Sequence, residues 1–191
     1  MAKLKSLDKN NFIQAAYSII KEGGIDALSL NVLAKHLGCA KGTFYTYYES
    51  MDDLILDINS ITLKQIQEVI SQTVGQGKSV RETMVDVCMN FISFAEENEN
   101  IWRLLFEYRV SNDENLPEWV EKEIHNVFTV VADYLSEYYK DEQKGKEVTA
   151  VLWATLHGLI SLHINKKLIT VTDSKVGDLS NILLDELFNE I

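Results

Sequence analysis

Proline, glycine and cysteine are scarce in this chain of 191 residues. Pro117 is the single proline and there are nine glycines, so few positions force a turn or break a helix. This scarcity argues against a turn-rich β fold and favours long helices. The two cysteines, Cys39 and Cys88, form no metal or redox pattern. There is also no N-glycosylation sequon and no signal-like N-terminus, so we expect a cytoplasmic protein.

The sequence also lacks the short motifs that mark catalysis. It contains no HExxH, no GxSxG, no phosphate-binding glycine loop and no paired metal-ligand spacing. His157 and His163 are six residues apart, on different faces of a helix, which argues against a shared metal. We therefore expect no enzyme, no cofactor and no metal. Four histidines and many carboxylates leave open a catalytic site that only folding would assemble.

Positive charge is in short supply, and what there is lies near the N-terminus. The net charge of −11 alone argues against a nucleic-acid partner. Residues 1–50, however, carry six lysines against four acidic residues, a net charge of +2. Residues 51–191 carry 12 cationic and 25 acidic residues, a net charge of −13. This asymmetry indicates a small anion-facing head on an acidic body.

Hydrophobic periodicity predicts an all-α fold. Apolar residues recur with helical spacing from Asp8 to Glu22, and Ser29 is placed to cap a second helix that ends at Gly38. A short helix is expected from Lys41 to Tyr48, and a long one from Ser50 to about Val74. Further helices are expected at roughly 79–97, 99–111, 116–140, 144–165 and 175–190, with no strand. The uncharged run 148–165 is at the edge of transmembrane length, but its polar side chains favour burial in a soluble body or between subunits.

The short helix at Lys41–Tyr48 has a small core face and many hydrogen-bonding side chains. On a helical wheel Phe44 and Tyr48 share the buried face, and Gly42, Thr43 and Thr46 lie opposite them. Such a surface suits a recognition helix, because small residues let the backbone approach base edges and flanking hydroxyls reach phosphates. The turn at Gly38-Cys39-Ala40 has the length and the leading glycine of a helix-turn-helix. At the start of the preceding helix, Ser29 and free backbone N–H groups are placed to bind a phosphate.

Through the motifs just described, the N-terminal 55 residues resemble the DNA-binding domain of TetR-family transcriptional regulators. The matching elements are Ser29, Leu33-Ala34-Lys35, Gly38, the run Lys41-Gly42-Thr43-Phe44-Tyr45, Tyr47-Tyr48, Ser50 and Leu54. The resemblance implies a helix-turn-helix DNA-binding domain over residues 1–50 and a helical ligand-binding and dimerisation domain over residues 51–191, about nine helices in all. It also implies a homodimer on a palindromic operator of double-stranded DNA, released when a small effector binds. In the body, Leu152 to Leu162 is similar to a signature of one subgroup of C-terminal domains in the family.

The residues assigned to DNA are Ser29, Lys41, Gly42, Thr43, Tyr45, Thr46 and Tyr47. Simple packing is the alternative for Tyr45 and Tyr47, and a solvated surface charge is the alternative for Lys41. The family usually has a lysine at the position of Met51, where it contacts phosphate. Methionine removes that contact, so with a head of only +2 we expect modest nonspecific affinity.

Aromatic side chains in the body suggest a cavity for an apolar or aromatic effector. The candidates are Phe91, Trp102, Phe106, Trp153 and His157. Core packing is the ordinary role of such aromatics, and His157 beside Gly158 also suits close helix packing at a dimer interface. The leading hypothesis is a ligand-responsive repressor. The alternative is an effector-binding or scaffolding helical protein with weakened DNA binding, which Met51 and the acidic body favour.

Overall fold

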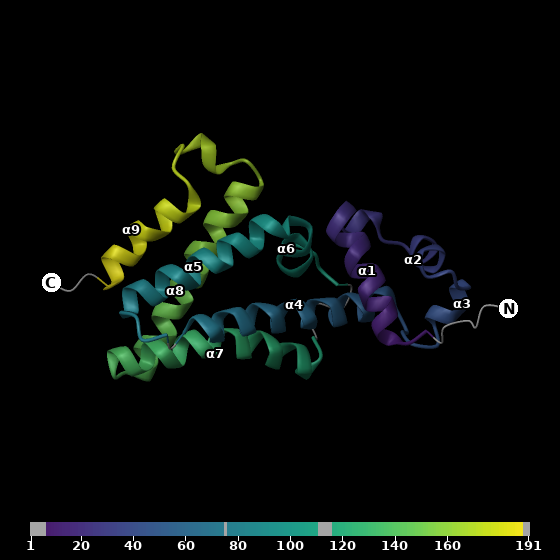
Figure 1. Cartoon of the computed structure of the whole chain (residues 1–191), viewed down its shortest axis with the longest axis horizontal. Coiled ribbons are helices and arrows are strands. Elements are labelled where there is room, and N and C mark those ends of the chain that lie inside the picture. The colour runs from purple at the N-terminus through teal and green to yellow at the C-terminus, as the bar shows by residue number, and fades with distance from the viewer. Residues whose placement is uncertain (1–6, 75, 111–115, 189–191) are drawn as a thin grey trace. The chain divides into compact units, whose positions relative to one another are not determined.

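A computed structural model of the chain describes residues 7–74, 76–110 and 116–188 (Figure 1). Within these ranges the regular structure is entirely helical, which confirms the all-α prediction. The α-helices of the described residues are α1 (Lys9–Gly23), α2 (Leu30–Leu37), α3 (Lys41–Phe44), α4 (Met51–Thr73), α5 (Val80–Glu97), α6 (Glu99–Phe106), α7 (Glu118–Tyr139), α8 (Glu142–Ile164) and α9 (Val176–Phe188). Two short 3-10 helices, η1 (Ile25–Ala27) and η3 (Leu168–Thr170), connect them.

The chain divides into two compact units, and neither is continuous in sequence. The first unit comprises the described residues of 1–62 and 98–120, so it joins α1, α2, α3 and the start of α4 to α6. The Asn100 side-chain amide at the start of α6 donates a hydrogen bond to the Lys21 carbonyl of α1 at 3.0 Å. The second unit comprises the described residues of 63–97 and 121–191. The predicted functional division at residue 50 stays a prediction.

The first two helices begin where the sequence predicts, because side chains satisfy their free N–H groups. Asp8 accepts from the Asn11 N–H at 2.9 Å, and the Asn11 side chain accepts from the Asp8 N–H at 3.0 Å. Ser29 Oγ accepts from the Val32 N–H at 3.3 Å. Gly38 ends α2 with φ of 65° and ψ of 32°, a left-handed conformation that favours glycine.

The predicted helix Lys41–Tyr48 is wrong beyond Phe44. The α-helix ends there and residues 45–47 form a turn, after which the Tyr48 N–H donates to the Phe44 carbonyl at 3.1 Å. Thr46 N–H donates to the Thr43 carbonyl at 3.2 Å and Tyr47 N–H donates to the Phe44 carbonyl at 2.9 Å, which is the i to i+3 spacing of 3-10 structure. Branched and aromatic residues have only moderate helix propensity, and a segment this short gains little from helical bonds alone. Its conformation is therefore set by what it packs against.

In the second unit α9 packs along α5, and α8 contacts both of these helices (Figure 1). The residues Leu152, Leu156 and Ile160 place one side of α8 in the core. The helix meets the length and apolarity of a membrane span by composition alone, and 28% of its most apolar window is buried. On its other side Val151 is 47% exposed and Leu162 is 41% exposed. This unit of the structure thus leaves an apolar helix face uncovered.

Helices α7 and α8 lie too close together at Gly145 to leave room for a side chain there. A Cβ atom at Gly145 would lie 2.2 Å from Ser136 Oγ, 2.6 Å from Ser136 N and 2.8 Å from the Ala132 carbonyl oxygen. Two of these atoms are backbone, so a side chain here must separate the helices.

We predict that Gly145→Ala lowers the free energy of unfolding by about 1–3 kcal/mol through this overpacking. Urea denaturation measures the change. Gly42→Ala is the control, because a Cβ there meets nothing within 4 Å and alanine is a better helix former than glycine. Equal stability of the Gly145→Ala variant and the parent would show that the crossing tolerates a methyl group.

Candidate nucleic-acid interface and ligand cavity

Four aromatic rings hold the short third helix against the rest of the first unit. The Phe12 ring of α1 lies 5.9 Å from Phe44, 5.3 Å from Tyr47 and 6.4 Å from Tyr48, centroid to centroid. Phe44 and Tyr48 stack at 5.4 Å, and both are almost fully buried. Their inward position confirms the wheel assignment. Aromatic pairs at these separations add stability beyond the area that they bury. This aromatic cluster therefore stabilises a helix that has too few hydrogen bonds to be stable alone.

A polar network joins the same cluster to α4. The Tyr48 hydroxyl donates a 2.9 Å hydrogen bond to Asp57 Oδ2. Lys9 Nζ lies 3.7 Å from the same oxygen and 4.7 Å from the centre of the Tyr48 ring. Burial raises the pKa of Tyr48 well above its ordinary value, and the neighbouring Asp57 carboxylate raises it further. Tyr48 is therefore a neutral donor at any physiological pH. Its hydrogen bond connects the end of residues 41–48, the recognition segment, to α4.

The opposite surface of the segment faces solvent. Lys41, Gly42, Tyr45 and Thr46 are exposed, and Thr43 is half-buried. The Tyr45 side chain is 62% exposed, and its ring rests edge-on against Phe44 at 5.4 Å. A Cβ at Gly42 would meet nothing within 4 Å, so the backbone is open to close approach. The surface combines one ammonium group, three hydroxyls and accessible backbone, which is suitable chemistry for base edges and phosphates.

Two of the residues assigned to DNA already have partners inside the protein. The half-buried Tyr47 donates its hydroxyl hydrogen to the Leu7 carbonyl oxygen, and its ring packs on Phe12. Ser29 Oγ accepts from the Val32 N–H, so its hydrogen remains available for a phosphate oxygen. These geometries show structural roles for both residues, and their DNA contacts stay predictions.

The start of α4, where the sequence predicts a missing phosphate contact, carries negative charge. Met51 is its first residue and is half-buried. The Asp53 carboxylate accepts from the Ser50 N–H at 2.9 Å, and Ser50 Oγ accepts from the Asp53 N–H at 3.2 Å. This reciprocal cap uses N–H groups that a phosphate oxygen would otherwise bind, and Asp52 follows Met51 in the same turn.

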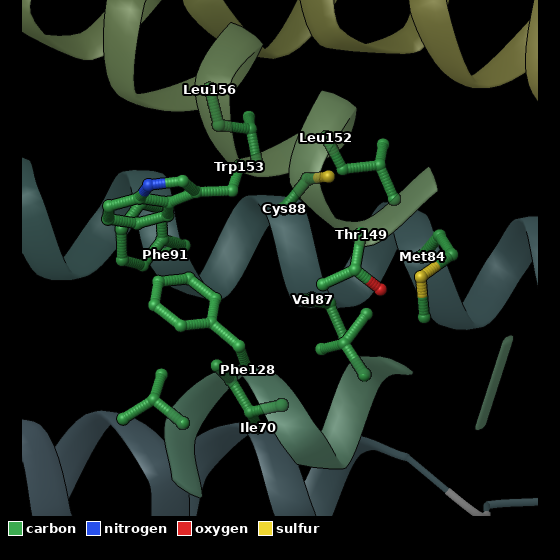
Figure 2. A pocket seen from close by; sticks show the side chains of 12 residues that line it. Ile70, Met84, Val87, Cys88, Phe91, Phe128, Thr149, Leu152, Trp153 and Leu156 are labelled. Atoms are coloured by element: carbon green, nitrogen blue, oxygen red, sulfur yellow. The ribbon is translucent and has the colours of Figure 1, made fainter. Parts of the chain in front are cut away.

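The second unit contains a small apolar cavity of about 50 Å³ between α4, α5, α7 and α8. Figure 2 shows the Phe128 ring pointing from α7 towards the rings of Phe91 and Trp153. The residues that line the cavity are Ile70, Met84, Val87, Cys88, Phe91, Val127, Phe128, Val131, Thr149, Leu152, Trp153 and Leu156.

The predicted effector residues fall into three groups. Phe91 and Trp153 both line the cavity, with ring centroids 5.3 Å apart. His157 lies against Trp153 at 5.3 Å but is not a lining residue. Trp102 and Phe106 pair at 4.3 Å in α6, which belongs to the first unit, and Trp102 is fully buried. Their effector contact stays a prediction that this cavity does not support.

Sequence reasoning did not single out Phe128. The apolar spacing of Val127, Phe128 and Val131 on α7 marks an inward face. That spacing does not reveal which core positions leave a space between them. Only side-chain packing shows this.

The cavity offers an effector almost no polar contact. Thr149 donates its hydroxyl hydrogen to the Gly145 carbonyl at 2.8 Å, so that hydrogen is already used. Burial raises the pKa of the Cys88 thiol to about 12, so it stays neutral. No lining residue carries a charge. Among the described residues, no three His, Cys, Asp or Glu side chains come together as a metal site would require.

Comparison with known proteins places both parts of the chain. Residues 12–58 match the family of bacterial regulatory proteins known as the tetR family, and residues 84–187 match the tetracycline repressor-like C-terminal domain.

Several solved structures share this fold. The transcriptional regulator FadR from Bacillus subtilis, in complex with stearoyl-CoA, has a TM-score of 0.71 at 20% identity, covering 96% of this chain and 100% of that one. The fatty acid degradation regulator FadR from Bacillus halodurans has a TM-score of 0.71 at 15% identity, covering 97% and 96%. A TetR-like transcriptional regulator from Rhodococcus sp. RHA1 has a TM-score of 0.65 at 17% identity, covering 95% and 96%.

We predict that the hydrogen bond from Tyr48 to the Asp57 carboxylate stabilises the first unit by about 1.5–3 kcal/mol. The coupling energy from a double-mutant cycle of Tyr48→Phe and Asp57→Asn, measured by urea denaturation, checks this. Tyr45→Phe is the matched control, since it removes the hydroxyl of an exposed tyrosine and keeps the ring. A coupling energy of zero would show that the network does not hold the segment.

Proposed function

Because the chain belongs to the TetR family of transcriptional regulators, we propose that it is a ligand-responsive repressor, cytoplasmic and homodimeric, that leaves a palindromic operator when a small molecule binds. The single observation that carries the proposal is the outward surface of the third helix. A segment held from beneath by four aromatic rings presents Lys41, Gly42, Thr43, Tyr45 and Thr46 to solvent. Exposed donors and acceptors on a rigid support are what base readout in the major groove requires.

The uncovered side of α8 supports a homodimer. Val151, Ala154, Gly158 and Leu162 follow one another at helical spacing on its exposed or half-exposed side. A Cβ at Gly158 would meet nothing within 4 Å, so another helix has room to approach closely there. On α9, Ile182 is 61% exposed. Two-fold packing of these helices would cover both apolar surfaces, and stable dimers of this kind bury roughly 2,000 Å² or more.

The cavity of the second unit supports an apolar effector. Its uncharged lining has nothing to compensate the burial of an ionised group. In the Bacillus subtilis FadR structure the bound molecule is stearoyl-CoA, and an apolar chain is the part of such a molecule that this lining suits. An effector favours release only through its differential affinity for two dimer arrangements, worth typically about 1–3 kcal/mol. Helix α4 is continuous from Met51 to Thr73, and Ile70 lines the cavity, so α4 is our candidate for the moving element.

The alternative function is an effector-binding or scaffolding protein with weakened DNA binding. Its support is the start of α4, where Met51 stands at a position that the family resemblance gives to a phosphate-binding lysine, and where Asp53 accepts from the Ser50 N–H. Under this alternative the ligand cavity would function without an operator.

Operator binding separates the two. The probe is DNA from the region upstream of the protein's own gene, and the expected site is an inverted repeat with half-sites roughly 34–36 Å apart. We predict that Tyr45→Ala or Thr43→Ala each costs about 1–3 kcal/mol of specific binding if these side chains meet base edges. Fluorescence anisotropy at fixed salt measures this.

Thr170→Ala is the control, because it removes an exposed threonine from the second unit. If both head variants bind the best site as tightly as the parent does, the recognition surface is misassigned. A parent protein with no preference for any upstream sequence would favour the alternative function.

A charge on the uncovered face should separate the subunits. We predict that Val151→Glu with Ile182→Glu gives a folded monomer at micromolar concentration, because two unpaired carboxylates would be buried at the interface. Analytical ultracentrifugation measures the mass, and circular dichroism checks the fold. Val69→Glu is the control, since Val69 is similarly exposed but lies on α4. A doubly substituted protein that stays dimeric would place the interface elsewhere.

A further inference from the structure

The apolar cavity has a neighbour on the surface of the same unit. A groove of about 500 Å³ lies along α7 and α8. Three residues, Phe128, Thr149 and Trp153, line both the groove and the cavity. The other residues of the groove are His125, Thr129, Ala132, Asp133, Glu142, Lys146 and Ala150. The wall between the two spaces is therefore made of two aromatic rings and one threonine.

The two rings close this wall by contact with each other. Phe128 and Trp153 meet edge to face, with centroids 5.0 Å apart and planes at 70°. Both side chains are only partly buried, unlike the core residues on either side of them. Thr149 is fixed by its hydrogen bond to Gly145, so it is the rings that can rotate aside.

The size of the cavity requires such a movement. About 50 Å³ holds one or two water-sized groups, whereas ligand pockets usually measure roughly 300–1,000 Å³. The cavity as it stands is therefore too small for an effector, and it must enlarge to hold one. When they separate, the cavity and the groove become one elongated space, apolar at its inner end and polar at its outer end.

The charges at the outer end select the head of the ligand. The groove contains two carboxylates, Asp133 and Glu142, and one ammonium, Lys146. Lys146 Nζ lies 2.5 Å from Glu142 Oε1, and the Asp133 carboxylate also acts on it, so its positive charge is already balanced. With His125 uncharged, the groove keeps a net charge of −1. Asp133 follows Phe128 by five residues, about 7.5 Å along the helix, so the head of a chain that passes the rings would lie near it.

We propose that Phe128 and Trp153 are the gate of the effector cavity, and that the effector is an amphiphile whose apolar chain passes the gate while a cationic head stays in the groove. This rests on the proposed function, which makes the cavity the effector site. The open faces of aromatic rings also attract cations, most strongly at the indole. An anionic head would face two carboxylates with no unpaired cation among the groove residues.

Two probes with the same chain and opposite charges test the head. Decyltrimethylammonium and decanoate are titrated into the protein at pH 8, below their micelle concentrations. Calorimetry and intrinsic tryptophan fluorescence report binding, with Trp102→Phe and Trp119→Phe introduced so that the signal comes from Trp153. The cation should bind about tenfold more tightly than the anion, as expected for a single net charge in a partly screened groove. Equal affinities, tighter binding of decanoate, or no binding of either probe would overturn the proposal.

Substitutions separate the groove from the general acidity of the protein. Asp133→Asn with Glu142→Gln changes the net charge of the groove from −1 to +1 and leaves Lys146 without its carboxylate partner, so the preference for the cation should be lost or reversed. Glu68→Gln with Glu121→Gln changes the net charge equally at exposed sites outside the groove, and it should keep the tenfold preference. The same loss in both double variants would assign the preference to long-range charge and overturn the assigned head site.

The gate has its own measurement. Phe128→Leu removes the ring contact with Trp153 while keeping an apolar side chain, so stopped-flow fluorescence should show an association rate constant at least about threefold higher. Phe94→Leu is the control, since Phe94 is a half-buried phenylalanine of the same unit that lines neither space. An unchanged rate constant for Phe128→Leu would remove the gate.

A failure of the proposed function can be told apart from a failure of the gate and head assignments by measuring operator affinity with and without decyltrimethylammonium. If decyltrimethylammonium binds as described but leaves operator affinity unchanged, the regulatory role is wrong and the gate and head assignments stand. If it does release the operator, saturating operator DNA must weaken its binding by the same factor.

Discussion

The contact of Phe12 with three rings of the recognition segment is the interaction on which the first unit depends. The third helix has one turn of α-helical structure, and an isolated helix of that length is unstable in water. Phe44, Tyr47 and Tyr48 supply the missing stability by packing on Phe12. Because the inward side chains provide the support, the outward ones are free to be small and polar. The same packing therefore explains both why so short a helix persists and why its outer face suits DNA.

The Tyr48–Asp57 bond extends this support into α4. Tyr48 keeps its proton because it is buried and because a carboxylate stands beside it, so the bond is insensitive to physiological pH. Lys9 contacts both partners, which leaves one fewer cation in the head available for phosphates. In the proposed DNA complex, a head of net charge +2 would rely more on shape and hydrogen bonds than on charge, which would make binding selective and nonspecific affinity modest.

In the second unit, aromatic packing encloses a space instead of supporting a surface. The Trp153 ring lies 5.0–5.3 Å, centroid to centroid, from the rings of Phe91, Phe128 and His157. The cavity beside these rings has room for only one or two water-sized groups. The glycine at position 145 brings α7 and α8 together near the shared wall of the cavity and groove. Packed interiors have few voids, so a rotation of one of these large rings would change the volume of the cavity.

The sequence by itself determined the all-α fold, the ends of the first two helices and the inward side of the recognition segment. Each of these depends on local chemistry: the apolar period, the Asp8 and Ser29 caps and the left-handed Gly38 are readable within a few residues. Tertiary structure alone decided where the third helix stops, that Tyr47 bonds Leu7, and that Trp102 and Phe106 belong to the first unit while Phe128 lines the cavity. These depend on contacts between residues tens of positions apart. Helical periodicity shows that a side chain points inward, but not which other side chains it meets there.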